Sequence, residues 1–170
     1  MNNISQVFAI GDIHGCDSLL KKIHKKILNK SEKVKGKKIL IYLGDYIDRG
    51  SKVKETIDTI INFRPENFKC IFLRGNHDQM LLDFVNNKRN SLEIWLYNNG
   101  TATLKSYCGN TIERELMNSS SCKQSIRETL VKSLPSSHLK FFNDLQFSYT
   151  WNDYFFVHAG IDPNRPLDNQ

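Results

Sequence analysis

Short apolar runs alternate with amphipathic stretches along the first half of the chain, and this alternation limits the possible folds more than any other feature. The apolar runs cover residues 7–10, 39–43 and 70–73, and apolar residues at helical spacing follow each of them. The order strand, helix, strand, helix, strand, helix predicts a parallel sheet joined by crossover helices. The expected fold class is therefore α/β.

The first of these helices has a clear apolar stripe. Its members are Leu19, Leu20, Ile23, Ile27 and Leu28, with lysines on the other face. We expect this stripe to pack on the sheet, because an amphipathic helix buries its apolar side.

The region after the third helix is expected to form a helical block and then a β-hairpin. Helices are predicted over residues 91–97 and 101–107 and on both sides of Pro135, with a polar loop over residues 118–121. This block is expected to form a lid over the sheet edge. Two β-prone runs flank residues 151–153, and this pattern predicts a hairpin with a short turn.

Acidic, amide and histidine residues gather where the expected strands end. They are Asp12, His14, Asp45, Asn76, His77 and His158. In a parallel sheet, functional groups collect at the carboxyl ends of the strands, so we expect these side chains to meet. In an extended chain Asp12 and His14 would point the same way, and Gly11 and Gly15 would let the backbone turn tightly beside an ion. Such mixed nitrogen and oxygen donors suit manganese, iron or zinc.

Each of these motifs has an ordinary structural explanation when it is taken alone. An Asp-x-His pair is often a turn with a surface histidine, Asn76 or Asp78 can cap a helix, and His158 can be a core histidine. Four motifs in order, each at a strand end, are poorly explained by chance. Together they predict a site for two metals that share one carboxylate.

Four sequence strings give a resemblance to a known family: GDIHG (residues 11–15), GDYIDRG (44–50), RGNHD (74–78) and FVHAG (156–160). In this order they resemble the calcineurin-like metallophosphoesterases. Within that family the chain is most similar to the phosphoprotein phosphatase branch, in its bacterial serine/threonine form. The resemblance implies a β-sandwich flanked by helices, of the four-layer α/β/β/α type. Residues 1–170 are expected to be a single domain that lacks part of the second sheet.

The resemblance also implies a set of metal ligands. Asp12 and His14 would bind the first metal, and Asp45 would bridge both metals. Asn76 and His158 would bind the second metal. The expected cofactor is therefore a pair of divalent ions, with manganese foremost and iron or zinc as alternatives.

Further residues would act on the substrate, according to the same resemblance. Arg49 and Asn76 would contact the phosphate oxygens, for which a guanidinium is well suited. His77 would protonate the leaving oxygen, and Asp48 would orient His77 and raise its pKa. A metal-bridging hydroxide would attack phosphorus in line, so no covalent phosphoenzyme is expected.

Two departures from the family pattern affect the expected activity. Asp78 stands where protein phosphatases usually have Glu, and in this respect the chain resembles the family's diadenosine tetraphosphatase branch. That branch, however, usually lacks the Asp that this chain has at position 48. Family members also continue beyond the point that matches Gln170, with a Gly-His element and a further arginine. The second metal site is therefore expected to lack one ligand, and turnover by these 170 residues alone is expected to be slow or absent.

Three functions remain open from the sequence. The favoured one is metal-dependent hydrolysis of phosphomonoesters, similar to serine/threonine protein phosphatases, on a phosphoprotein or a small phosphorylated substrate. The alternatives are a symmetrical diadenosine tetraphosphatase and a truncated relative with little or no activity. The open sheet edge that a shortened second sheet would leave is expected to favour self-association.

Composition excludes some other classes. The net charge is +6, and many lysines fall in residues 21–38, but no aromatic residues lie between them as nucleic-acid binding by stacking would need. We therefore expect a solvated helix face and no specific nucleic-acid binding. No apolar run approaches the ~18 residues of a membrane span, and no secretory signal is seen, which favours the cytoplasm. The four cysteines (Cys16, Cys70, Cys108 and Cys122) form no C-x-x-C pair and are expected to be reduced and mostly buried.

Overall fold

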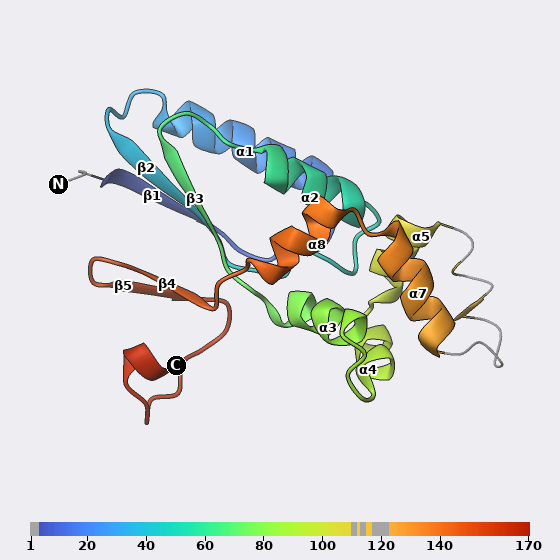
Figure 1. The fold of residues 1–170 in the computed structure, drawn as a ribbon. Coiled ribbons are helices and arrows are strands. Elements are labelled where there is room, and N and C mark those ends of the chain that lie inside the picture. Colours follow the sequence, from blue (N-terminus) through green and yellow to red (C-terminus); the bar gives the residue numbers. More distant parts are fainter. Residues whose placement is uncertain (1–3, 110–111, 113–114, 117–122) are drawn as a thin grey trace.

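The computed structural model describes residues 4–109, 112, 115–116 and 123–170. Three parallel strands form one sheet in chain order: β1 (Ile4–Ile10), β2 (Lys37–Tyr42) and β3 (Phe68–Phe72) (Figure 1). Each strand begins two or three residues before the apolar run that predicted it. The predicted parallel sheet is confirmed.

Helices α1 (Asp17–Ser31) and α2 (Val53–Asn62) cover one face of this sheet. Along α1 the buried residues are Leu20, His24, Ile27 and Ser31, which follow one another at helical spacing. The predicted stripe is therefore partly wrong, because Leu19, Ile23 and Leu28 lie beside this line and are exposed. The sheet contacts a narrower band of the helix than its apolar residues suggested.

His24 fills the middle of the buried line of α1. Its Nε2 is hydrogen-bonded to the Tyr42 hydroxyl (2.8 Å), and its ring stacks on Phe63 with a centroid distance of 3.7 Å. Burial lowers the pKa of His24 to about 4, so the imidazole is neutral in the folded protein at neutral pH.

The opposite face of the sheet carries a β-hairpin formed by β4 (Ser148–Trp151) and β5 (Tyr154–Val157) (Figure 1). Asn152 takes a left-handed conformation (φ 49°) in the two-residue turn. The aromatic residues of the hairpin pack on a second apolar cluster of the sheet, made by Ile39, Ile41, Ile71 and Leu73. The described residues thus form three layers, helices, parallel sheet and hairpin, and the mixed α/β prediction is confirmed.

The remaining α-helices are α3 (Asn76–Val85), α4 (Ser91–Tyr97), α5 (Thr101–Cys108), α7 (Lys123–Ser133) and α8 (Ser136–Asn143), and a 3-10 helix, η1 (Leu167–Asn169), lies near the carboxyl terminus. Helices α4, α5, α7 and α8 pack on α2, α3 and one another, beyond the carboxyl ends of the strands (Figure 1). The predicted helices are confirmed, and one of them, α8, lies against the edge strand β3, where the Phe141 ring is 5.4 Å from the Phe72 ring. The other three, α4, α5 and α7, pack on neighbouring helices.

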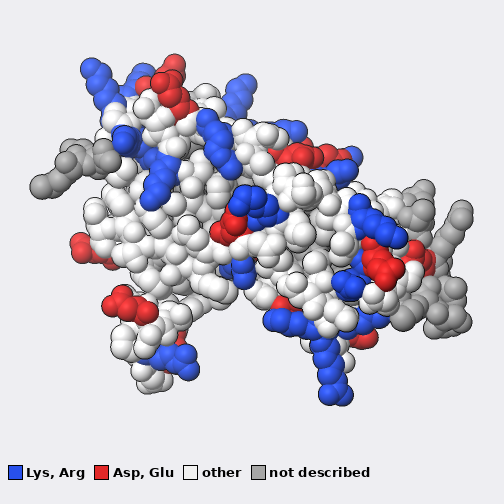
Figure 2. All heavy atoms as spheres, viewed as in Figure 1, with Lys and Arg blue, Asp and Glu red and all other residues white. Residues whose placement is uncertain are grey.

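Charged side chains are dispersed over the face drawn in Figure 2, where acidic residues lie among the lysines and arginines. One lysine of the basic stretch is buried: Lys38 is 7% exposed, and its ammonium lies 5.6 Å from the centre of the Phe68 ring. The rest of this stretch agrees with a solvated helix face, since most of its lysines are exposed.

The cysteines differ from the expectation of burial. Cys16 is exposed, Cys70 and Cys108 are half-buried, and none of these three is part of a disulfide. Cys122 and the predicted loop over residues 118–121 lie outside the described residues. Within the part of the chain that the structure describes, no helix has both the length and the apolar character that crossing a membrane requires.

Candidate metal centre

Backbone hydrogen bonds tie the loop after β1 to the loop after β2 at the carboxyl end of the sheet. The N–H groups of Ile13 and His14 both donate to the Asp45 carbonyl (3.0 Å each), and the Gly15 N–H donates to the Tyr46 carbonyl (2.9 Å). The two loops are thereby fixed side by side, which brings their acidic and histidine side chains to one place.

Close packing of these loops requires glycine at particular positions. A Cβ atom at Gly75 would lie 2.1 Å from Asp45 Oδ1 and 2.4 Å from the Asp45 nitrogen, and one at Gly44 would lie 2.5 Å from the Gly75 nitrogen. Gly15 has φ 63°, as its predicted role in a tight turn requires. Gly11, the other glycine of that prediction, has no positive φ, and a Cβ atom there would meet no atom within 4 Å.

His14 presents an unpartnered nitrogen to two carboxylates. Its Nδ1–H donates to the Ile47 carbonyl (2.7 Å), which leaves the lone pair of Nε2 free for a ligand. This Nε2 is buried without a hydrogen-bond partner and lies 3.7 Å from Asp12 Oδ2 and 3.7 Å from Asp45 Oδ2. The expectation of an extended chain here is wrong, because His14 has φ 45°; a left-handed turn aims its side chain.

His158 reaches the same centre from the end of β5. Its Nδ1–H donates to the Leu43 carbonyl (2.9 Å), and its Nε2 lies 3.1 Å from Asn76 Oδ1 and 3.5 Å from Asp45 Oδ1. With the proton on Nδ1, the Nε2 of this tautomer turns its lone pair toward these oxygens. A cation between these atoms would remove the repulsion between the Nε2 lone pair and the oxygen lone pairs.

Two overlapping groups of side chains in the described residues have the spacing of metal ligands. One contains His14, Asp45 and His77, the other contains Asp12, Asp45 and His158, and in each group the ligand atoms lie within 4.8 Å of one another. Asp45 belongs to both groups, as a bridging carboxylate would. The resemblance instead pairs Asp12 with His14, but the 3.7 Å between their side chains makes all five residues one cluster.

His77 lies between a carboxylate and a guanidinium. Its Nδ1–H donates to Asp48 Oδ2 (2.7 Å), and its Nε2 lies 3.5 Å from Arg49 Nη2 and 3.9 Å from Asp45 Oδ2. The hydrogen bond to Asp48 raises the pKa of His77, and burial opposes that rise. His77 is buried, whereas Arg49 and Asn76 are exposed, so incoming phosphate would reach the last two directly.

The Asp48 carboxylate has two further partners that the sequence did not indicate. The Trp95 indole N–H donates to Asp48 Oδ2 (2.9 Å), and the Thr103 hydroxyl donates to Asp48 Oδ1 (2.5 Å). Both residues come from helices outside the four motif strings. No local pattern marks them, because a tryptophan and a threonine on apolar helices are ordinary core residues.

Asp78 supports the backbone of the centre. Its Oδ2 accepts hydrogen bonds from the N–H groups of Asp45 and Gly75 (2.9 Å each), and its Oδ1 accepts one from the Tyr46 N–H (3.1 Å). Burial raises the pKa of Asp78 to about 7, while the three N–H donors act in the opposite direction. The capping explanation that the sequence left open therefore holds for Asp78, which caps α3 and clamps the loop after β2 at once.

A model of the calcineurin-like phosphoesterases matches residues 5–169, which is nearly the whole chain. The chain belongs to the calcineurin-like phosphoesterase family. It is 33% identical over 107 residues to serine/threonine-protein phosphatase 1 of Salmonella typhimurium. It is also 36% identical over 80 residues to the asymmetrical bis(5'-nucleosyl)-tetraphosphatase PrpE of Anoxybacillus flavithermus.

These matches cover 58% and 44% of the chain, and 40% and 32% of the respective relatives. A crystal structure of a putative diadenosine tetraphosphatase resembles the fold with a TM-score of 0.55 at 20% identity, over 99% of this chain and 59% of that one. The chain therefore spans less than two thirds of each of these phosphoesterases.

Members of the calcineurin-like phosphoesterase family use divalent metals, and the donors found here fit such ions. The buried, unpartnered Nε2 of His14 is the clearest sign, because a buried polar atom without a partner is costly. Carboxylate oxygens beside imidazole nitrogens suit divalent transition metals.

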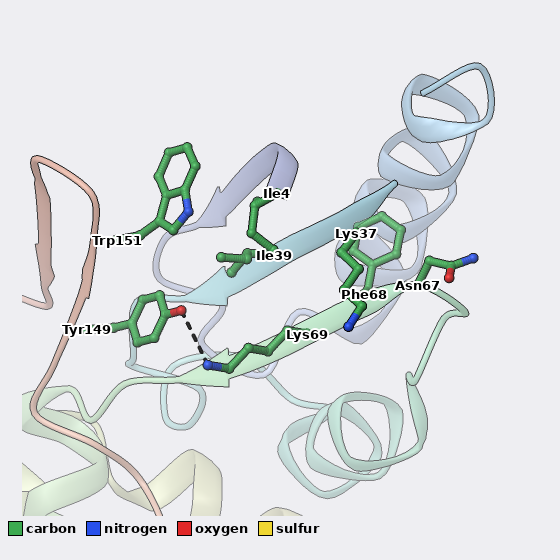
Figure 3. A pocket seen from close by; sticks show the side chains of 8 residues that line it. All are labelled: Ile4, Lys37, Ile39, Asn67, Phe68, Lys69, Tyr149 and Trp151. Atoms are coloured by element: carbon green, nitrogen blue, oxygen red, sulfur yellow. Dashed lines mark hydrogen bonds between the residues drawn. The ribbon is translucent and has the colours of Figure 1, made fainter. Parts of the chain in front are cut away.

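Two cavities of this family member differ in their position relative to the metal centre. An open cavity of about 350 Å³ adjoins it and is lined by Asn76, His158, Arg74 and Phe147, among others. A cavity of about 420 Å³ lies at the other end of the sheet, where Lys69 and Tyr149 are hydrogen-bonded (3.4 Å; Figure 3). The second cavity has none of the candidate ligands in its lining and is separate from the metal centre.

Proposed function

We propose that this centre hydrolyses phosphomonoesters with the help of two divalent ions held by Asp12, His14, Asp45, Asn76 and His158. The observation that supports this most is the buried Nε2 of His14, which faces two carboxylates without a hydrogen-bond partner. Bound divalent ions, for which manganese is our choice, would lower the pKa of water and neutralise phosphate charge.

Side chains of the protein bind the phosphate and protonate the leaving oxygen. Arg49 and Asn76 are exposed beside the ligands and bind the phosphate oxygens, the guanidinium by paired hydrogen bonds. His77 protonates the leaving oxygen from Nε2, and Asp48 holds the ring in the required tautomer through Nδ1. The buried position of His77 keeps bulk water away from its proton.

For the substrate we propose a phosphoserine or phosphothreonine protein or a small phosphomonoester. The hydrogen bond between Asp48 and His77 supports this choice, because Asp48 matches the phosphatase form of the motif. The alternative is a dinucleoside tetraphosphate, which is favoured by Asp78 and by the likeness to PrpE. Comparing kcat/KM for a phosphoserine peptide and for diadenosine tetraphosphate separates these two substrates.

The function is tested by metal binding and hydrolysis in one set of variants. Manganese is titrated into the wild-type chain, into His14→Gln and into His24→Gln, a matched change of a buried histidine outside the centre. We expect His14→Gln to weaken manganese binding and 4-nitrophenyl phosphate hydrolysis at least about tenfold, and His24→Gln to leave both unchanged. Failure of the wild-type chain to bind manganese, or equal hydrolysis by His14→Gln, would overturn the proposal.

Two further expectations belong to this proposal. Self-association through an open strand edge would make the molecular mass in sedimentation rise with protein concentration. A cytoplasmic location suits a metal-dependent phosphatase whose Cys16 and Cys70 are not part of a disulfide, since the cytoplasm keeps cysteines reduced; fractionation of cells that express the tagged chain tests it.

A further inference from the structure

We propose that Trp95 and Thr103 are positioning residues for the protonation step. They hold the Asp48 carboxylate, which in turn holds His77. This inference rests on the proposed function, since it takes His77 to be the group that protonates the leaving oxygen. It extends the site to α4 and α5, which carry none of the four motifs.

Three side chains from three helices converge on one fully buried carboxylate. Asp48 is 0% exposed. Its Oδ2 accepts hydrogen bonds from His77 Nδ1 (2.7 Å) and Trp95 Nε1 (2.9 Å), and its Oδ1 accepts one from the Thr103 hydroxyl (2.5 Å). A buried carboxylate needs such donors, because it has lost its hydration. Two of the three donors come from the helical block. The acceptor position that remains on Asp48 for the His77 N–H therefore depends on that block.

Thr103 fixes the main chain of Asp48 as well as its side chain. The Asp48 N–H donates to the Thr103 hydroxyl oxygen (3.0 Å), while the hydroxyl proton goes to the carboxylate. Asp48 and Arg49 are consecutive non-glycine residues with positive φ (69° and 61°). Few non-glycine residues adopt this conformation, and it persists only where its surroundings hold it.

The indole of Trp95 has little freedom to move away from Asp48. Trp95 is fully buried, and its ring lies 5.6 Å from the ring of Phe84. A Cβ atom at Gly100 would come within 2.7 Å of the indole carbons, so the backbone there closes over the ring. The indole N–H is therefore a fixed donor, which is what a preorganised hydrogen-bond network requires.

The chemical consequence concerns the direction of the His77 proton. With Oδ1 and Oδ2 of Asp48 both held, the His77 Nδ1–H has one acceptor position, and Nε2 points toward Arg49. Without the Thr103 hydroxyl, the carboxylate would rotate and the ring would follow it. The rate of hydrolysis would then fall for substrates whose leaving oxygen needs a proton, and it would fall less for substrates whose leaving group is a stable anion.

The kinetic test compares leaving groups across matched threonine variants. Thr103→Val is expected to lower kcat roughly tenfold for a phosphoserine peptide, as loss of one hydrogen bond to a charged group suggests, and to lower it less for 4-nitrophenyl phosphate. KM and manganese affinity stay at wild-type values. Thr103→Ser restores the rate, and Thr101→Val, on the same helix, leaves it unchanged. Equal losses for both substrates in Thr103→Val would overturn the proposal.

A nuclear magnetic resonance readout tests the positioning without any turnover. In chain labelled with ¹⁵N-histidine, the His77 Nδ1 proton is expected to exchange slowly with water, and faster in Thr103→Val and Trp95→Phe. An unchanged exchange rate in both folded variants would overturn the proposal, even if the wild-type chain hydrolyses phosphate esters. A wild-type chain that neither binds manganese nor hydrolyses a phosphate ester, while the exchange rates change as expected, would overturn the proposed function instead. Should Thr103→Val not fold, Trp95→Phe is compared with wild type in both measurements.

Discussion

The two ends of the parallel sheet are built from different kinds of side chain. At the carboxyl end, His14, Asp45 and His77 are buried and face one another. At the amino end, Lys69 is exposed beside a large cavity and reaches Tyr149 by a long hydrogen bond (3.4 Å). Charge at the amino end can be hydrated, whereas the buried groups at the carboxyl end need a ligand or a fixed partner. Burial of polar groups therefore distinguishes the candidate site at the carboxyl end from the cavity at the amino end.

The largest difference between the two ends should appear on removal of the shared carboxylate. Asp45→Asn is expected to lower both manganese affinity and hydrolysis at least about a hundredfold, since even groups outside the ligand set change affinity 10–100-fold. Lys69→Met at the amino end should change neither. Calorimetry and steady-state kinetics measure both effects, and an active Asp45→Asn variant would mean that the wrong end of the sheet has been chosen.

Close packing at the carboxyl end can be tested with two glycines near the same loops. Gly75→Ala would force a Cβ atom against the Asp45 backbone and should destabilise the fold by roughly 3 kcal/mol. Gly11→Ala meets no atom within 4 Å and should change the free energy of unfolding by less than about 0.5 kcal/mol. Urea unfolding measures the free energy of unfolding of both variants. Equal values for the two would refute the close approach of the two loops.

His24, on the buried face of α1, makes the free energy of unfolding depend on pH. The pKa of His24 is about 4 in the folded protein and near 6.5 when unfolded, so the unfolded chain binds the extra proton between these values. Its contribution to stability is full above pH 6.5 and is lost as pH falls toward 4, with a slope of at most about 1.4 kcal/mol per pH unit. His24→Gln should remove this part of the slope in urea unfolding at pH 5 to 7.5. A slope unchanged by the substitution would mean that His24 is solvated.

The smallest effect is expected at the amino end itself. Lys69→Met removes a hydrogen bond and a cation–π contact with Tyr149, whose ring centre lies 5.0 Å from the ammonium. Because Lys69 is exposed, the loss in the free energy of unfolding should be below about 1 kcal/mol. A loss above 2 kcal/mol in urea unfolding would show that the hairpin depends on this contact.

The sequence was sufficient where local pattern decides the outcome. Apolar runs with helical stretches between them fixed three parallel strands, because parallel strands need crossover connections. That connectivity brings the ends of β1 and β2 together, so Asp12 and Asp45 could be expected side by side from their positions alone, whereas His158 reaches them because the separate hairpin packs on the sheet. The glycine at position 75 was also visible in its motif, although its steric reason was not.

Only the tertiary structure decided which groups surround the cluster. Trp95 and Thr103 contact Asp48 across 47 and 55 residues of sequence, and contacts of that kind leave no periodic trace. The left-handed turn at His14 and the narrow buried line of α1 likewise depend on neighbours brought in by packing. The chain's sequence by itself determined the ligand-bearing strand ends, because period and chain order are local properties. The orientation of His77 came from the packing of α4 and α5, because hydrogen bonds to a buried carboxylate form only when distant segments meet.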